Sequence, residues 1–220
     1  MTISLVTGSN RGIGLELCRQ LQSRGHAVIG VCRAPSPALL KLGVRIERDI
    51  DITSDEALAT LGARLRGTRL DLVIANAGIL RDDSLEDVEL ETVREQFEVN
   101  ALGPLRTVKQ LLPNLNDGGK VALITSRMGS IADNGSGGYY GYRMSKAALN
   151  AAGVSLAHDL KPHRIAVAIL HPGYVRTDMT GNSGQLEPSE SARMLLERID
   201  ALEQHTSGSF WHANGERLPW

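Results

Sequence analysis

The chain has 220 residues, 42% of them hydrophobic, which is enough for one sizeable core and short for two domains. Its formal net charge of -1 provides no basic field for nucleic acid and no polybasic patch for a membrane surface. No stretch reaches the about 18 consecutive apolar residues of a membrane span, and the apolar run after Met1 is too short for a signal peptide. We therefore expect a cytoplasmic protein without nucleic-acid or membrane partners.

Short apolar runs rich in β-branched residues alternate along the chain with helical patterns. In chain order, the predicted strands are Ile3–Thr7, Ala27–Cys32, Val44–Asp49, Leu70–Ala75, Lys120–Thr125 and Ile165–Leu170, and the predicted helices are roughly Gly12–Arg24, Ser54–Arg66, Leu90–Leu112, Tyr140–Leu160 and Ser189–Glu203. The strands are apolar almost throughout, as in a parallel sheet with helices on both faces. Right-handed crossovers then give a doubly wound Rossmann-type α/β domain, in which ligands bind at the carboxyl ends of the strands.

The two cysteines, Cys18 and Cys32, belong to no C-x-x-C pair and lie near no histidine pattern. This spacing argues against a zinc site and against a disulfide. We expect two buried thiols and no metal.

A glycine-rich turn, Thr7–Gly14 with the sequence T-G-S-N-R-G-I-G, follows the first predicted strand. Its three glycines would let the backbone approach a pyrophosphate closely, and the helix that follows offers free N–H groups and the positive end of its dipole. A tight strand-to-helix turn without a ligand would also use glycines. The spacing G-x-x-x-G-x-G is more specific than the glycines alone.

Tyr142 and Lys146 are four residues apart, so they lie on one face of the predicted helix. A neighbouring ammonium favours the phenolate and would lower the pKa of the tyrosine from about 10 by roughly 1–3 units, which suits proton transfer. Tyr139 and Tyr140 are rival candidates, but neither has a lysine four residues later. His171 also titrates near neutrality, and we interpret it as structural.

These motifs resemble the short-chain dehydrogenase/reductase family. The glycine turn, Asn76-Ala77-Gly78, Asn100, Ser126 and the Y-x-x-x-K pair occur here in the order of that family. The resemblance extends from Ile3 to Thr177 and more loosely to Trp220. The ending Gly208–Trp220 is similar to that of the C-factor/sniffer-like carbonyl reductases. The resemblance implies one domain over residues 1–220 with a mostly parallel seven-stranded sheet, a dinucleotide-binding half at about 1–115 and a catalytic half at about 116–220.

The resemblance also implies the catalytic roles. Ser126 would orient the substrate carbonyl, Tyr142 would protonate its oxygen, and Lys146 would hold the nicotinamide ribose and assist the tyrosine. Asn100 would position a water behind the lysine, although a core asparagine that only bonds backbone is the alternative. Ser126 lies 16 residues before Tyr142, further than is usual in the family, so Ser130 remains a rival.

The same resemblance assigns a set of cofactor-binding residues. They are Gly8, Asn10, Arg11, Gly12, Ile13, Gly14, Arg33, Asp51, Ile52, Asn76, Ala77, Gly78, Tyr142, Lys146, Pro172, Gly173, Val175 and Thr177. In the family the aspartate matched by Asp51 meets the adenine amino group. Asp49 is a competitor for that role, and helix capping by Thr53 or Ser54 would explain part of the segment without a ligand.

The end of the second strand predicts a preference for NADP(H), with NAD(H) as the alternative. An enzyme that reads the ribose hydroxyls of NAD usually places an acid there, and Cys32 stands in its place. Arg33 and Arg11 could converge on a 2′-phosphate, because a guanidinium makes charge-assisted bonds to phosphate oxygens.

The predicted function is therefore NADP(H)-dependent reduction of a small carbonyl compound, or oxidation of the corresponding alcohol. The resemblance further implies a homodimer or homotetramer that pairs through Leu90–Leu112 and Tyr140–Leu160. The alternative is a dinucleotide-binding signalling or redox-sensor protein of the same fold that acts through partners. The presence of both Tyr142 and Lys146 favours the enzyme.

Overall fold

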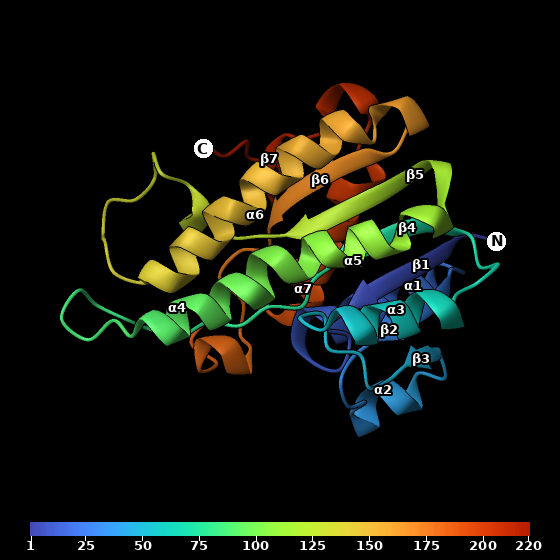
Figure 1. Cartoon of the computed structure of the whole chain (residues 1–220), viewed down its shortest axis with the longest axis horizontal. Helices are drawn as coiled ribbons and strands as arrows, with labels where there is room; N and C mark the ends of the chain where they lie inside the picture. Colours follow the sequence, from blue (N-terminus) through green and yellow to red (C-terminus); the bar gives the residue numbers. More distant parts are fainter.

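One sheet of seven parallel strands runs through the computed structural model, which describes residues 1–220 (Figure 1). The strands are β1 (Ile3–Thr7), β2 (Ala27–Val31), β3 (Arg45–Glu47), β4 (Leu70–Ala75), β5 (Leu115–Ile124), β6 (Ala166–His171) and β7 (Phe210–His212). Their order is β3-β2-β1-β4-β5-β6-β7, and every neighbouring pair is parallel. The doubly wound Rossmann-type fold is thus confirmed, and the sheet is entirely rather than mostly parallel.

Helices cover both faces of the sheet because successive strand residues point to opposite sides. The helices are α1 (Gly12–Ser23), α2 (Pro37–Lys41), α3 (Asp55–Arg64), α4 (Leu90–Phe97), α5 (Gly103–Leu111), α6 (Tyr140–Asp159) and α7 (Pro188–Asp200). In β1, Leu5 packs in the core with α3, α5 and α6, whereas Val6 packs in the core with α1 and α7. Figure 1 shows α3 to α6 in front of the sheet and α7 behind it.

The sequence predicted one continuous helix over Leu90–Leu112, and this prediction is wrong because the α-helix is interrupted in the middle of that range. A π-helical turn, Glu98–Leu102, separates α4 from α5. Pro104 stands in the first turn of α5 and has no backbone N–H, so the carbonyl four residues earlier, that of Asn100, loses its α-helical partner. The interruption therefore falls at the asparagine that the sequence singles out.

Two short elements escaped the sequence patterns. Helix α2 spans five residues and begins after Ser36, whose hydroxyl accepts a hydrogen bond of 3.1 Å from the Leu39 N–H. Strand β7 spans three residues at the sheet edge. Elements this short show too few turns or alternations for periodicity to reveal them.

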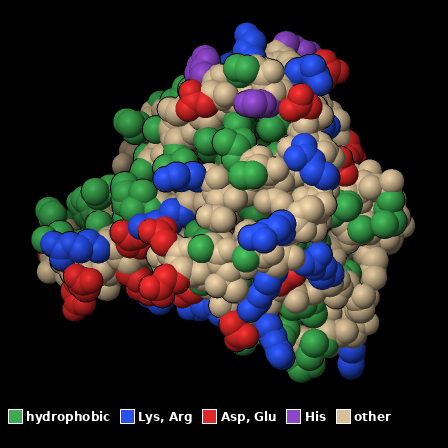
Figure 2. Space-filling model, turned by 45° about the vertical axis from the view of Figure 1, so that its right-hand side comes forward, with side chains coloured by type: hydrophobic (Ala, Val, Ile, Leu, Met, Phe, Trp, Pro, Cys, Tyr) green, Lys and Arg blue, Asp and Glu red, His purple; other side chains and the backbone are tan.

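The strand register places the turns that carry the predicted ligand-binding residues at one edge of the sheet. Val6 pairs with Ile74, Ile74 with Ala122, and Ala122 with Ala168, so the carboxyl ends of β1, β4, β5 and β6 lie side by side. Cys18 and Cys32 are buried free thiols, as expected. No helix combines the length and the apolar character needed to cross a membrane. On the face drawn in Figure 2, basic and acidic side chains are interspersed.

Candidate active site

A cleft of about 990 Å³ opens at the carboxyl edge of the sheet. It extends from Arg33 and Asp51 at one end to Tyr142 and Lys146 at the other. Of the residues predicted to bind the cofactor, sixteen line it: Gly8, Asn10, Arg11, Gly12, Ile13, Gly14, Arg33, Asp51, Ile52, Asn76, Ala77, Gly78, Tyr142, Lys146, Pro172 and Thr177. Gly173 and Val175 line a second, smaller hollow that adjoins Tyr142.

The glycine turn fits a pyrophosphate. Gly8 has a φ of +66°, and a Cβ on Gly14 would lie 2.1 Å from the Gly8 carbonyl oxygen, so both positions require glycine. No side chain caps the N-terminus of α1, and the N–H groups of Gly12 and Ile13 have no backbone partner. Free N–H groups at the positive end of a helix dipole form a site for a phosphate group.

Asn76 fastens this turn to the end of β4. Its Nδ2 donates to the carbonyl oxygens of Thr7 at 3.1 Å and Gly8 at 3.3 Å. In return, the Thr7 hydroxyl accepts from the backbone N–H groups of Asn76 at 3.1 Å and Ala77 at 3.2 Å. The two segments that line the middle of the cleft are therefore held as one rigid unit.

At the end of the cleft near β2 and β3, Asp51 lines the wall and Asp49 does not. The Asp51 Oδ1 accepts hydrogen bonds from the N–H and the hydroxyl of Thr53, at 2.9 and 2.8 Å. Burial alone would raise the pKa of Asp51, but these bonds and the charge of Arg33 hold it below its usual value. Asp51 is therefore a fixed carboxylate that can accept a hydrogen bond at this position.

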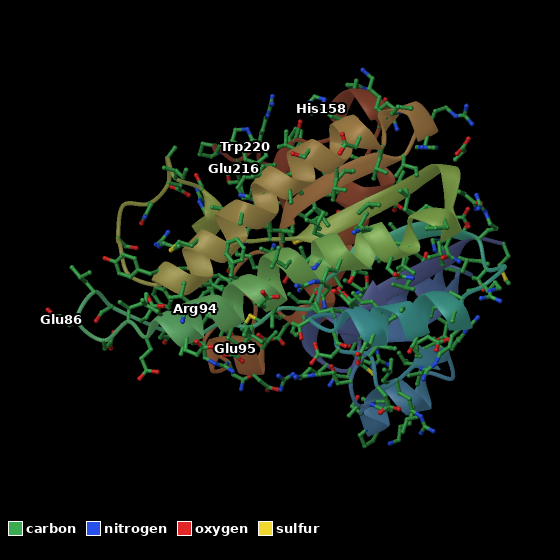
Figure 3. The ribbon with its side chains drawn as sticks, viewed as in Figure 1. Glu86, Arg94, Glu95, His158, Glu216 and Trp220 are labelled. Carbon is green, nitrogen blue, oxygen red and sulfur yellow. The ribbon has the colours of Figure 1, made fainter.

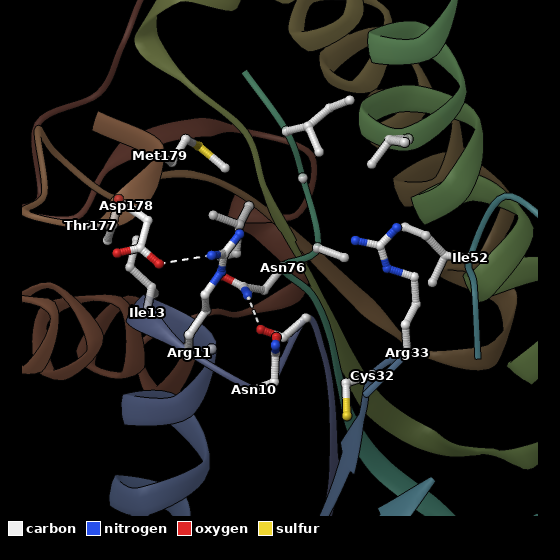
Figure 4. Close-up of a pocket in the computed structure, with 18 of the residues that line it drawn as sticks. Asn10, Arg11, Ile13, Cys32, Arg33, Ile52, Asn76, Thr177, Asp178 and Met179 are labelled. Carbon is white, nitrogen blue, oxygen red and sulfur yellow. Dashed lines mark hydrogen bonds and ion pairs between the residues drawn. The ribbon is translucent and has the colours of Figure 1, made fainter. Parts of the chain in front are cut away.

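The two arginines proposed to read a 2′-phosphate do not converge. Arg11 Nη1 donates to the Asp178 carboxylate at 2.8 Å, on the far side of the cleft, as Figure 4 shows. Arg33 lines the cleft and forms no ion pair. The guanidinium of Arg33 is therefore free to bind an anion, whereas that of Arg11 must first leave Asp178.

Tyr142 and Lys146 are both buried at the other end of the cleft, on α6. Lys146 Nζ donates to the Ile124 carbonyl at 2.9 Å and lies 5.7 Å from the centroid of the Tyr142 ring. Burial raises the pKa of Tyr142 to about 12, although the Ser126 side chain acts in the opposite direction. Burial likewise lowers the pKa of Lys146 to about 8. The expected lowering of the tyrosine pKa by Lys146 does not appear here: burial of the phenol sets the direction of the shift, and the Ser126 side chain opposes it.

Ser126, and not Ser130, lies with Tyr142. It lies two residues after the end of β5 and lines the smaller hollow together with the tyrosine, and its Oγ accepts from the Met128 N–H at 3.1 Å. Ser130 is buried outside this hollow, and its Oγ accepts from the Asp133 N–H at 3.1 Å. Of the two serines that the sequence left open, Ser126 is therefore the one placed beside Tyr142, and its catalytic role stays a prediction.

Asn100 is fully buried beneath the cleft and does not line it. Its Oδ1 accepts from the Ile79 N–H at 2.8 Å, and its Nδ2 donates to the Ile79 carbonyl at 2.8 Å and to the Ser145 hydroxyl at 3.0 Å. The side-chain amide therefore ties the segment after β4 to α6. The two bonds to Ile79 match the alternative in which the amide bonds backbone, and the third goes to the Ser145 side chain.

The smaller hollow, of about 340 Å³, contains residues that the sequence analysis missed. They include Leu80, Arg127, Met128, Asp133, Arg143, Tyr174, Met179 and Thr180. Arg127 and Arg143 directly follow Ser126 and Tyr142 in the chain, and that adjacency was the available signal. His171 also lines the hollow, and burial lowers its pKa to about 3, so its ring is neutral.

The C-terminal tail closes over the segment that follows Ser126. The Trp220 carbonyl accepts from the Ala132 N–H at 2.8 Å, and the Trp220 ring stacks on Phe210 with 5.5 Å between centroids. Arg127 pairs with Asp133 and lies 3.9 Å from Glu216 of the tail. Figure 3 shows Glu216 and Trp220 beside α6. The tail thereby supports the loop that carries one wall of the hollow.

Residues 2–188 match the short chain dehydrogenase family. The 1-hydroxy-2-glutathionyl-2-methyl-3-butene dehydrogenase of Rhodococcus sp. (strain AD45) is 42% identical over 226 residues, which cover 100% of each chain. The C-signal protein of Myxococcus xanthus is 45% identical over 154 residues, which cover 69% of this chain and 93% of that protein.

Several solved structures are similar to this chain over its full length. The carbonyl reductase Sniffer of D. melanogaster has a TM-score of 0.93 at 31% identity, with 100% of this chain and 99% of that chain covered. The NADPH-bound carbonyl reductase from chicken fatty liver has a TM-score of 0.89 at 30% identity, with 100% of both chains covered. A Burkholderia multivorans structure described as a short-chain dehydrogenase/reductase with bound NADP has a TM-score of 0.92 at 31% identity, with 100% and 99% covered. The chain therefore belongs to the short-chain dehydrogenase family, whose members are oxidoreductases that use NAD(P).

Proposed function

We propose that the protein reduces the carbonyl group of a small molecule with NADPH, or oxidises the corresponding alcohol with NADP. One observation carries the proposal: Ser126, from the end of β5, and Tyr142 and Lys146, from α6, meet where the long cleft joins the smaller hollow. A bound nicotinamide supplies or accepts the hydride, and the protein positions the reactants and moves the proton.

The buried phenol of Tyr142 is the proton donor in this scheme. Because its pKa is raised to about 12, it stays protonated at neutral pH and can give its proton to a carbonyl oxygen. Ser126 donates a hydrogen bond to the same oxygen and holds it against the phenol. Lys146 holds the nicotinamide ribose hydroxyls, and the hydrogen bonds of Asn100 keep the segment after β4 in place beside α6.

NADP(H) is the proposed cofactor. Cys32 is buried at the position where an acid would meet the ribose hydroxyls of NAD, and Arg33 stands beside it without an ion-pair partner. The Burkholderia multivorans and chicken structures, which hold NADP and NADPH, are similar to this chain throughout. Both considerations support a 2′-phosphate in the end of the cleft near Arg33.

A signalling or redox-sensing protein that binds a dinucleotide and acts through partners is the second candidate. The 45% identity with the C-signal of Myxococcus xanthus favours it. The Rhodococcus relative, by its name a dehydrogenase of a hydroxylated glutathionyl compound, favours an enzyme and makes alcohol oxidation a direction to test. The two candidates differ in whether the protein converts a substrate into a product.

The test is a screen with NADPH that carries deuterium at the nicotinamide carbon from which hydride leaves. Aldehydes, ketones, diketones and quinones are offered in turn, and the corresponding alcohols are offered with NADP. We expect NADPH oxidation with at least one carbonyl class and deuterium at the carbinol carbon of the product. If NADPH binds but no compound is reduced or oxidised, the signalling candidate replaces the enzyme.

A further inference from the structure

The hollow beside Tyr142 has one more guanidinium than carboxylate. Among its lining side chains, Arg127 and Arg143 are basic and Asp133 is acidic. His171 adds no charge, because burial keeps its ring neutral at neutral pH by lowering its pKa to about 3. The lining thus holds two cations and one anion, and Glu216, which lies beside Arg127 outside the lining, supplies a second anion. What can attract an anion here is therefore a guanidinium without a counter-ion rather than a net charge of the site.

Arg143 is the cation without a counter-ion. The Arg127 guanidinium pairs with Asp133 and lies 3.9 Å from a Glu216 oxygen. Arg143, which is half-buried, forms no ion pair anywhere in the chain. The positive charge that lacks a counter-ion therefore resides on the residue directly after Tyr142.

The hydrogen bonds of Arg143 go only to uncharged oxygens. Its Nε donates to the Gly138 carbonyl at 3.1 Å and its Nη2 to the Ser136 hydroxyl at 2.9 Å. Contacts with the carbonyls of Met128 and Gly137 are both 3.5 Å, at the outer limit for a hydrogen bond. Nη1, whose one contact is the 3.5 Å approach to Met128, is thus the nitrogen most available to an anion, and a second bond from Nη2 would compete with Ser136.

Apart from its charged residues, the hollow is lined by apolar side chains and by hydroxyl groups. Leu80, Met128, Val175 and Met179 provide apolar side chains, and Ser126 and Tyr142 provide the two hydroxyl groups. A ligand that fills it would place one polar group at these hydroxyls, apolar atoms along the wall and, if charged, a negative group at Arg143.

We propose that the substrate carries a carboxylate, which Arg143 binds while the reacting carbonyl lies against Ser126 and Tyr142. This inference rests on the function proposed above and names the class of its substrate: carbonyl compounds with a carboxylate on an apolar body. The planar fork of a guanidinium suits a carboxylate, because it donates two parallel charge-assisted hydrogen bonds.

A purely structural role for Arg143 makes a different prediction. If the side chain only holds the carbonyls of Gly137 and Gly138, its loss disturbs the loop and impairs charged and neutral substrates alike. If it binds the substrate, its loss impairs the charged substrate selectively. The ratio between matched substrates therefore separates the two roles.

The substrates for the test are 3- and 4-formylbenzoate and their methyl esters, which share the aldehyde and differ in charge. We expect the wild type to reduce at least one acid with a kcat/KM at least about 10-fold above that of its ester, mainly through KM. In Arg143→Met this acid-to-ester ratio should fall by about 10–100-fold, as expected for the loss of a charge-assisted hydrogen bond. Arg143→Lys, which keeps the charge and loses the fork, should lie between.

Arg19→Met is the matched control, because Arg19 lies on α1 and pairs with Glu16 away from the hollow. It should keep the wild-type ratio. A wild-type ratio of one or below, or a ratio that Arg143→Met leaves unchanged, overturns the proposal.

Calorimetry separates this inference from the proposed function. Each formylbenzoate is titrated into the NADPH complex of Tyr142→Phe, with and without Arg143→Met, so that binding is measured without turnover. We expect binding to weaken by about 10-fold or more when Arg143 is lost. If neither acid binds, or if both complexes bind equally, the inference is wrong even where carbonyl reduction is demonstrated. Binding without turnover in the wild type counts against the proposed function alone.

Discussion

At the scale of single residues, burial sets the protonation states of Tyr142 and Lys146. Both side chains lie inside the protein, where the charged form of each is disfavoured, so the pKa of the tyrosine rises to about 12 and that of the lysine falls to about 8. A neutral phenol is the form that donates a proton to a carbonyl. The reverse reaction needs the phenolate as proton acceptor, so it becomes more favourable as the pH rises towards this pKa.

Arg33→Ala is the residue substitution that tests cofactor choice. We expect the dissociation constant for NADPH to rise by about 10–150-fold, the equivalent of roughly 1.5–3 kcal/mol for a lost charge-assisted bond, with little change for NADH. Arg11→Ala should have a smaller effect, because Arg11 is 70% exposed and already pairs with Asp178. The measurement is fluorescence titration of both dinucleotides.

Arg48→Ala is the control for Arg33→Ala, since Arg48 is an exposed neighbour that pairs with Asp49 and lies outside the cleft. Equal wild-type affinities for NADPH and NADH, or an NADPH affinity that Arg33→Ala leaves unchanged, would show that this arginine does not read the 2′-phosphate.

At the scale of elements, a distant carboxylate fixes the start of α6. Both oxygens of Asp83 accept backbone hydrogen bonds there, Oδ1 from Tyr140 and Oδ2 from Gly141 at 3.2 Å, and the Asp83 carbonyl accepts from Tyr139 at 2.8 Å. A negative charge at a helix N-terminus also interacts favourably with the dipole. The helix that carries Tyr142 is therefore anchored from the segment after β4.

Asp83→Ala should lower the free energy of unfolding by about 1–2 kcal/mol, the usual cost of a lost N-cap, and thereby lower Tm by about 2–4 °C per kcal/mol. Thermal unfolding followed by circular dichroism measures it. Asp82→Ala is the control, because Asp82 is exposed and makes no side-chain contact of this kind. Equal Tm values for the two variants would contradict the capping role.

Sequence patterns predicted the long elements well and the interruptions poorly. Continuous apolar runs identified β1, β2, β4 and β6, because central strands must be apolar on both faces. The break between α4 and α5 could have been inferred from Pro104, whereas β7 depends on pairing with β6, a contact that no local pattern contains. Start positions such as Leu115 of β5 were missed because Gly118 and Gly119 look like a turn.

For the site, the sequence was informative where chemistry demands a fixed spacing. Tyr142 and Lys146 share a helix face, and the glycine turn has a geometry of its own, so both were predictable. The sequence could not predict the partner of Arg11, the pKa of Tyr142 or the lining of the smaller hollow. Each of these depends on segments that only folding brings together.

At the scale of the whole molecule, the parallel sheet brings the chemistry to one edge. The turns after β1 and β4 form the floor of the cleft, and the ends of β5 and β6 border the hollow in which the carbonyl is proposed to react. Helix α6 crosses the boundary between the two and carries Tyr142 and Lys146. The proposed cofactor site and the proposed substrate site are thereby separate, and the proposed proton donor lies between them.

Turnover and NADPH binding by Tyr142→Phe test the central claim most directly. On a carbonyl compound that the wild type reduces, we predict that turnover falls by at least roughly 10²–10⁴-fold, as for a lost general acid, while the dissociation constant for NADPH stays within about twofold of the wild type. A Tyr142→Phe variant that binds NADPH normally and keeps near-normal turnover would contradict the assignment of Tyr142 as the proton donor.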